Sequence, residues 1–137
     1  MIHSVDPIAA LLGSWSAQPG LWAIVFRILL SVVFATVIGC ERATKRHAAG
    51  LRTFILVSLA STCAMLLDEF VTLSFSSAAV LPLLSAAAVI GIAVISSNSI
   101  LYSSKNQIKG LTTSVALWAC GILGLAVGAG FYTAAVI

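Results

Sequence analysis

Long apolar runs constrain the fold of this chain more than any other feature. They cover residues 21–40, 53–70, 80–102 and 111–137. Each is close to the roughly 20 residues that a helix needs to cross the hydrocarbon core of a bilayer. The runs are continuous and do not alternate with period two, which favours helices over the strands of a barrel. We therefore expect an all-α, polytopic transmembrane helical bundle with four full spans.

The scarcity of charge supports the same conclusion. Only 8% of the residues are charged, whereas a soluble domain carries about 25%. So few charges cannot cover a water-facing surface, so the lipid bilayer is the expected environment of the chain. The net charge of +3 is better explained by basic connectors between spans than by nucleic-acid binding, and we expect no nucleic-acid partner.

The two ends of the chain differ from the central spans. Residues 1–18 are too short to span, and Asp6 followed by Pro7 is typical of a helix start. Apolar residues then recur at helical spacing, which predicts an interfacial helix on the outer surface: Ile8, Leu11, Leu12 and Trp15. We divide the chain into this segment and a transmembrane domain, residues 19–137. At the far end, residues 128–130 read Gly-Ala-Gly. Either they break the helix and leave a partial fifth span, or one long tilted helix continues to the end.

The basic residues predict the orientation. Six of the seven Lys and Arg residues lie in the connectors 41–52 and 103–110, and the connector 71–79 has none. Two spans separate the basic connectors, so both lie on one side of the membrane. The positive-inside rule makes that side cytoplasmic and places the N-terminus outside.

Small residues spaced three or four positions apart are candidate packing surfaces. Ala35 and Gly39 form such a pair in the first span, and Gly121, Gly124 and Gly128 line the last one. Small residues let helices approach closely in lipid. Two uses stay open: packing within one chain, or contact between two copies in a homodimer.

Charges within or beside the spans are candidate functional groups because they are costly in lipid. Arg27 lies near the outer end of the first span, and Asp68 and Glu69 lie at the outer end of the second. We expect an Arg27–Asp68 pair that ties the two helices. The alternatives are an outward-facing cation or proton site, and snorkelling of Arg27 to the headgroups.

A second polar group is predicted at the cytoplasmic ends of the spans, which antiparallel threading brings to one level. Glu41 either fixes the loop, as a cap or by pairing with Arg52, or contributes to a surface that binds a partner or a small ligand. The sequence contains no catalytic triad, phosphate loop or histidine pair for a metal, so we expect no enzymatic activity. The candidate residues are Glu41, Arg42, Arg52, Thr53, Asn98, Thr112 and Thr113.

Several of these residues belong to a recognisable series. The segments 38–42 (IGCER), 49–53 (AGLRT) and 109–118 (KGLTTSVALW) follow one another in an order that resembles the membrane domain of the MgtC/SapB family. The family has a glycine-rich stretch in its third span, where this chain reads IAVISSNS at residues 92–99. The motif adds Trp118 to the candidate residues.

The resemblance implies a non-enzymatic, multi-pass protein of the bacterial inner membrane. It implies a role in magnesium homeostasis, in survival inside host phagocytes and hence in virulence, and in membrane energetics. That role is regulation of a membrane partner such as the F-type ATP synthase. The alternative is a secondary transporter or accessory channel for magnesium or another cation. No cofactor is expected, and magnesium is the one candidate ligand.

Overall fold

The structure is a computed structural model that describes residues 6–16, 20–44, 49–75, 82–98, 100–102 and 108–136. It begins with a short helix, α1 (Pro7–Leu12), and a single 3-10 turn, η2 (Ser14–Ser16). Three long helices follow in the order α2 (Leu21–Thr44), α3 (Leu51–Phe75) and, later, α5 (Leu111–Gly128). A shorter helix, α4 (Leu83–Asn98), lies between α3 and α5 in the chain, and α6 (Tyr132–Val136) comes last.

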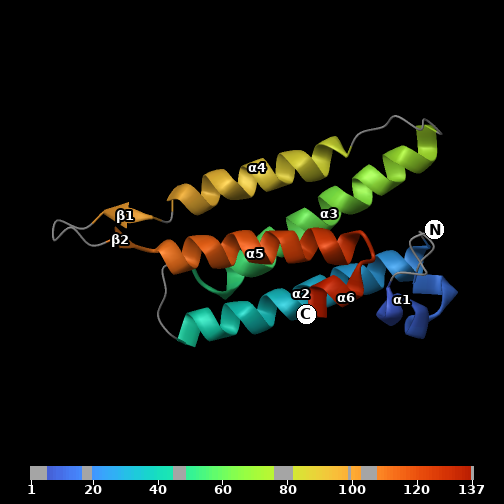
Figure 1. Ribbon diagram of the computed structural model, residues 1–137, viewed down its shortest axis with the longest axis horizontal. Coiled ribbons are helices and arrows are strands. Elements are labelled where there is room, and N and C mark those ends of the chain that lie inside the picture. Colours follow the sequence, from blue (N-terminus) through green and yellow to red (C-terminus); the bar gives the residue numbers. More distant parts are fainter. Residues whose placement is uncertain are drawn as a thin grey trace.

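The helices run along the long axis of the molecule in alternating directions (Figure 1). Helix α3 contacts α2, α4 and α5, and α2 also contacts α5. The end of α2, the start of α3, the end of α4 and the start of α5 lie at one end of the bundle (Figure 1). We call this the basic-connector end, because both connectors 41–52 and 103–110 leave the helices there. Helix α1 lies at the opposite end.

Three helices of the described chain are long and apolar enough to cross a membrane, namely Leu21–Thr44, Leu51–Ser74 and Leu111–Gly128. The fourth expected span, residues 80–102, is shorter than predicted. Helix α4 has 16 residues, which is about 24 Å of helix. Pro82 precedes it, and after Asn98 the chain turns into a two-residue antiparallel pair of β1 (Leu101–Tyr102) with β2 (Ile108–Lys109). The bundle therefore has three long apolar helices and one shorter one.

Helix α2 has its small and polar residues inside and its large apolar residues outside. Every fourth residue is buried, in the series Ala23, Arg27, Ser31, Ala35 and Gly39. The opposite face exposes large side chains at the same spacing, among them Val25, Leu29, Val33 and Val37. A soluble protein would bury the valines and leucines. This inverted pattern is that of a helix whose outer face contacts lipid.

The glycines of α5 let it approach α3 closely. A Cβ at Gly124 would lie 2.4 Å from the backbone oxygen of Ser58, and one at Gly128 would lie 3.0 Å from that of Thr62. A Cβ at Gly121 would instead meet the side chain of Ile92 in α4. On α2, Gly39 packs against Leu51 and Ala35 is fully buried in the apolar core. All five predicted packing residues are thus buried within one copy of the chain.

The last helix does break, and a Schellman-type cap ends α5. Gly130 has a positive φ of 77°, its N–H donates to the Val127 oxygen at 3.0 Å, and the Phe131 N–H donates to the Ala126 oxygen at 2.9 Å. This pattern is typical of a glycine at the residue after a helix C-cap. The five-residue α6 then packs against α5 and α1.

Candidate functional site

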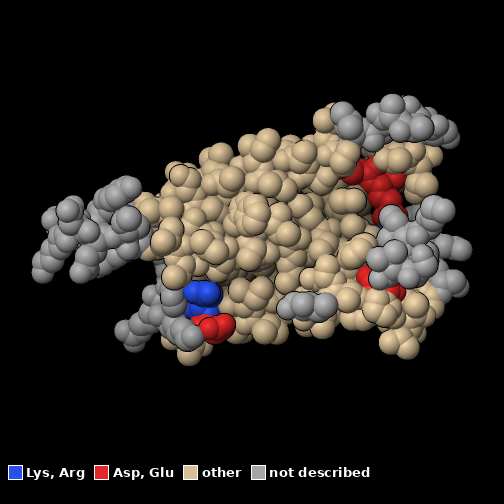
Figure 2. Space-filling model, viewed as in Figure 1, with Lys and Arg blue, Asp and Glu red and all other residues tan. Residues whose placement is uncertain are grey.

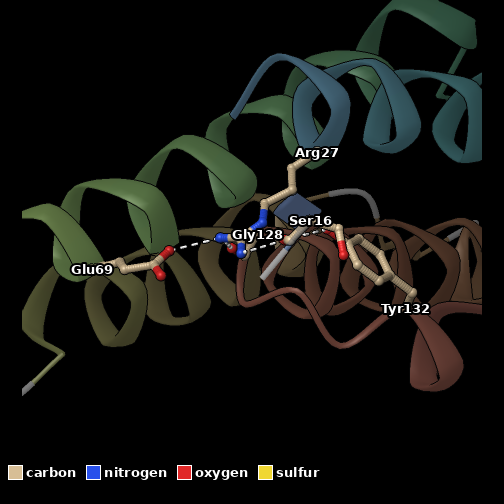
Figure 3. A network of polar contacts seen from close by, with 5 residues as sticks. All are labelled: Ser16, Arg27, Glu69, Gly128 and Tyr132. Atoms are coloured by element: carbon tan, nitrogen blue, oxygen red, sulfur yellow. Dashed lines mark hydrogen bonds and ion pairs between the residues drawn. The ribbon is translucent and has the colours of Figure 1, made fainter. Parts of the chain in front are cut away.

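A buried polar network ties together the end of the bundle opposite the basic-connector end. It is centred on Arg27 of α2, whose side chain is only 2% exposed (Figure 3). Its Nη1 donates to Glu69 Oε2 of α3 at 2.7 Å and to the Gly128 carbonyl of α5 at 2.9 Å. Its Nη2 donates to the Ser16 carbonyl of η2 at 3.2 Å. One guanidinium therefore holds four elements together.

The position of Arg27 suits a cation. Gly128 lies in the last turn of α5, where backbone carbonyls without helical partners and the helix dipole concentrate negative charge. The Tyr132 hydroxyl of α6 also donates to the Ser16 carbonyl, at 3.3 Å. Two edge-to-face ring contacts, Trp15–Phe26 and Phe26–Tyr132, cover the network on the side of η2. The guanidinium Nε is buried and has no hydrogen-bond partner within the described residues.

The acidic partner of Arg27 differs from the expected one. We expected Asp68, but the ion pair is made by Glu69. Asp68 instead caps α4: its Oδ1 accepts from the Leu84 N–H at 3.1 Å and its Oδ2 from the Ser85 N–H at 2.7 Å. Adjacent residues on a helix point about 100° apart, so one faces α2 and the other α4. The sequence could not show which of the two faces α2.

A third carboxylate, Asp6, caps two helices at once. It accepts from the Ile8 and Ala9 N–H groups of α1, as expected for an N-cap, and from the Thr133 N–H of α6 at 3.3 Å. The Thr133 hydroxyl also donates to it. Burial by itself would raise the pKa of Asp6, but the hydrogen bonds from Thr133, Ala9 and Ile8 outweigh it and hold the pKa below its ordinary value. Asp6 is therefore charged at neutral pH. The α6 contact was missed because no local pattern links residues 127 positions apart.

The N-terminal helix is shorter than the predicted apolar stripe. It ends at Leu12, where Gly13 takes a positive φ of 89°, so Trp15 lies in η2 and not on the same helical face. Leu11 is exposed and Ala9 is buried. The interfacial location of residues 1–18 and their separation from residues 19–137 stay predictions.

The predicted polar cluster lies on the ends of four helices at the basic-connector end (Figure 1), except for Trp118, which lies about two turns into α5. The side chains differ in burial, however. Thr113 is buried, Arg42 and Thr53 are half-buried, and five are exposed: Glu41, Arg52, Asn98, Thr112 and Trp118. The Glu41–Arg52 pair stays a prediction. Within the described residues, no group of three or more His, Cys, Asp or Glu side chains is placed to hold a metal ion.

The charged side chains that one face of the molecule shows, among the described residues, lie near its two ends (Figure 2). On the face shown in Figure 2, the described charged side chains lie near one end or the other, with an uncharged band between them. The inverted α2 pattern, the long apolar helices and this band define the class: a multi-pass helical membrane protein.

Comparison with known sequences identifies the family. The MgtC family profile matches residues 28–137, so the chain belongs to the MgtC family. It is similar to Protein SapB of Bacillus subtilis, 33% identical over 123 residues that cover 87% of this chain and 52% of SapB. It is also similar to the Escherichia coli protein named "Putative magnesium transporter YhiD", 31% identical over 112 residues that cover 79% of this chain and 52% of YhiD. The chain spans about half the length of these curated relatives. No solved structure matches it significantly.

Proposed function

We propose that this chain is a non-enzymatic protein of the bacterial inner membrane that regulates a partner complex and is thereby linked to magnesium homeostasis and membrane energetics. The F-type ATP synthase is the partner that we consider first. The orientation that we propose follows the positive-inside rule: the connectors 41–52 and 103–110 face the cytoplasm, and the N-terminus faces outward.

The internal hydrogen bonding of the buried hydroxyls in the middle of α3 is the observation that supports regulation over transport. The Thr62 hydroxyl donates to the Ser58 and Gly124 carbonyls, both at 2.9 Å, and the Ser61 hydroxyl to the Val57 carbonyl at 2.9 Å. Transporters place substrate sites near the bilayer midplane, in helices whose unwound backbone is open to the ligand. Here the break between α5 and α6 is at one end of the bundle, and Arg27 occupies it.

An apolar groove between α3 and α4 offers a surface for a partner helix. Its volume is about 310 Å³, and a Cβ added to Gly91 at its wall would meet open space, with no neighbouring atom within 4 Å. Small residues let a second transmembrane helix approach closely. The lining residues are Leu56, Val57, Ala60, Ser61, Ala88, Gly91, Ile92 and Ile95.

The test is to fill the groove and measure the partner. In Gly91→Trp the indole occupies the groove, whereas Val33→Trp adds the same ring to the exposed face of α2 as a matched control. We expect the wild type and Val33→Trp to change ATP-driven proton pumping in inverted membrane vesicles and to co-purify with ATP synthase subunits. Gly91→Trp should do neither. An unchanged pumping rate with all three proteins contradicts this partner.

The polar cluster gives a second test of the regulatory proposal. Glu41→Ala is assayed both for thermal stability in detergent and for growth of the host cell in low magnesium. A stable but inactive variant supports a binding role for Glu41, whereas a less stable one supports the loop-fixing pair with Arg52.

The alternative function is transport of magnesium or another cation, alone or as an accessory channel. The similarity to the Escherichia coli protein named "Putative magnesium transporter YhiD" favours this alternative. Uptake of magnesium into proteoliposomes that contain only this protein would decide for transport and against regulation.

A further inference from the structure

A pocket opens beside the Arg27 network, between α2 and α3. Its volume is about 300 Å³, at the lower end of the range for small-molecule sites. Four lining side chains are apolar and two are polar. The lining residues are Ile24, Leu66, Glu69, Phe70, Leu73 and Ser74.

Glu69 supplies the hydrogen-bond acceptor of this pocket. Only its Oε2 binds Arg27, and Figure 3 shows the second carboxylate oxygen turned away from the guanidinium. That oxygen accepts no hydrogen bond within the described residues, and the side chain is 29% exposed. The other polar residue, Ser74, is already satisfied, since its hydroxyl donates to the Phe70 carbonyl at 2.8 Å. A ligand with a hydrogen-bond donor would therefore meet one free carboxylate oxygen.

Arg27 does not cancel the attraction of this oxygen for a cation. The same guanidinium donates to the carbonyls of Gly128 and Ser16, and it lies at the negative end of the α5 dipole. Its charge is thus shared between the carboxylate and a helix terminus. An ionised carboxylate has room for about four hydrogen bonds, so the Arg27 contact leaves acceptor capacity.

The pocket opens on an exposed face of the bundle, which we expect to meet lipid at headgroup level. Phe70 and Leu73 form its wall and are 67% and 58% exposed. On α2, the exposed Trp22 lies two residues before Ile24, where an aromatic side chain marks the membrane–water interface. From Leu73 to Leu66 the α3 wall extends about 10 Å along the helix, toward the centre of the bundle. Glu69 and Ser74 therefore lie nearer the outer end of α3 than Leu66, which leads toward the centre of the bundle.

We propose that this pocket binds a phospholipid with a primary ammonium headgroup, such as phosphatidylethanolamine. The ammonium donates to the free oxygen of Glu69, an acyl chain passes Leu66 toward the centre of the bundle, and Ile24 and Leu73 flank the headgroup. Charge-assisted hydrogen bonds of this kind are short and strong. A quaternary ammonium has no N–H to donate, and an anionic headgroup has no cation. The site should therefore discriminate among lipids with the same chains. Lipid binding here does not depend on the regulatory function.

The test uses the full chain, purified and delipidated in detergent, with three lipids of identical acyl chains: phosphatidylethanolamine, phosphatidylcholine and phosphatidylglycerol. Bound lipid is counted by native mass spectrometry, and thermal stability is measured with each lipid. We expect several-fold greater retention of phosphatidylethanolamine than of the other two, and the largest rise in melting temperature with it.

Two variants test whether the preference for phosphatidylethanolamine depends on this pocket. Leu73→Trp fills the pocket without touching the ion pair, and Glu69→Gln removes the carboxylate; both should abolish the preference. Val33→Trp, on the exposed face of α2, should keep it. Equal retention of the ethanolamine and choline lipids by the wild type overturns the proposal and leaves an apolar groove without headgroup recognition. A preference that survives in Leu73→Trp also overturns it, and this variant decides the matter if Glu69→Gln fails to fold.

Discussion

Arg27 Nη1 lies 2.7 Å from Glu69 Oε2, although the two residues are 42 positions apart in the chain. The pair fastens α2 to α3 and, through the other hydrogen bonds of Arg27, fastens both to η2 and α5. Such a buried cation is costly in an apolar surrounding unless its partners are all in place. Arg27 is therefore the residue on which the order of this end of the bundle most depends.

Removing the cation should cost more stability than neutralising its acidic partner. Arg27→Met leaves Glu69 and the Gly128 carbonyl without their donor, and only Tyr132 still donates to the Ser16 carbonyl. We expect a loss of about 3–5 kcal/mol, the range for breaking a buried pair. Glu69→Gln should cost less, because Glu69 is 29% exposed and the amide oxygen still accepts from Arg27. Thermal unfolding in detergent gives both values. A greater loss in Glu69→Gln would contradict the central role of Arg27.

Asp68 should act as a helix cap and not as a partner of Arg27. Asp68→Ala removes the acceptor of the Leu84 and Ser85 N–H groups, and the expected cost is about 0.5–2 kcal/mol. Hydrogen exchange should increase at the first turn of α4. In a double-mutant cycle, Arg27→Met and Asp68→Ala should add within about 0.5 kcal/mol. A larger coupling energy would instead support an Arg27–Asp68 interaction.

The contact between Asp6 and Thr133, which joins the N-terminal segment to α6, should weaken at acidic pH. Its pKa in the folded chain is lower than the ordinary value of 3.8, so its contribution to stability is complete above that pH and is lost as the pH falls further. We expect Asp6→Asn to melt at a lower temperature than wild type at neutral pH. The difference should shrink below about pH 4. A difference that is constant from pH 7 to pH 3 would show that the charge of Asp6 is not involved.

Two glycine-to-alanine substitutions should have opposite effects. At Gly124 the added Cβ meets the Ser58 backbone at 2.4 Å, so α3 and α5 must separate, at a cost of about 1–3 kcal/mol. Gly91 lies in α4 with open space around it, and alanine there should be neutral or stabilising by up to about 1 kcal/mol. Thermal unfolding in detergent compares the pair directly. Equal losses at both positions would argue against the close approach of α5 to α3.

Labelling of single cysteines, after replacement of Cys40, Cys63 and Cys120, tests the orientation. Thr44→Cys and Lys109→Cys lie at the basic-connector end, and Thr72→Cys lies toward the other end of α3. We expect a membrane-impermeant reagent added to intact cells to label only Thr72→Cys. Labels at Thr44 and Lys109 on opposite sides of the membrane would refute the bundle topology itself.

The sequence by itself determined what depends on composition and on local pattern. Long apolar runs with few charges require a bilayer, so the helical class and its long spans follow from composition and run length alone. Local rules also placed the Asp6–Pro7 helix start and raised the break at residues 128–130 as one of two alternatives. The regular spacing of small residues identified Gly121 and Gly124 as packing positions, although it left open whether they pack within one chain or between two.

Only the tertiary structure decided which distant groups meet. Glu69 rather than Asp68 pairs with Arg27, because the rotation of α3 about its axis sets which carboxylate faces α2, and side-chain packing along the whole helix fixes that rotation. Asp6 contacts Thr133, and Arg27 contacts the Gly128 carbonyl, only because α1 and α6 pack against each other and α5 packs against α2. Local propensity contains no information about such contacts between residues far apart in the chain.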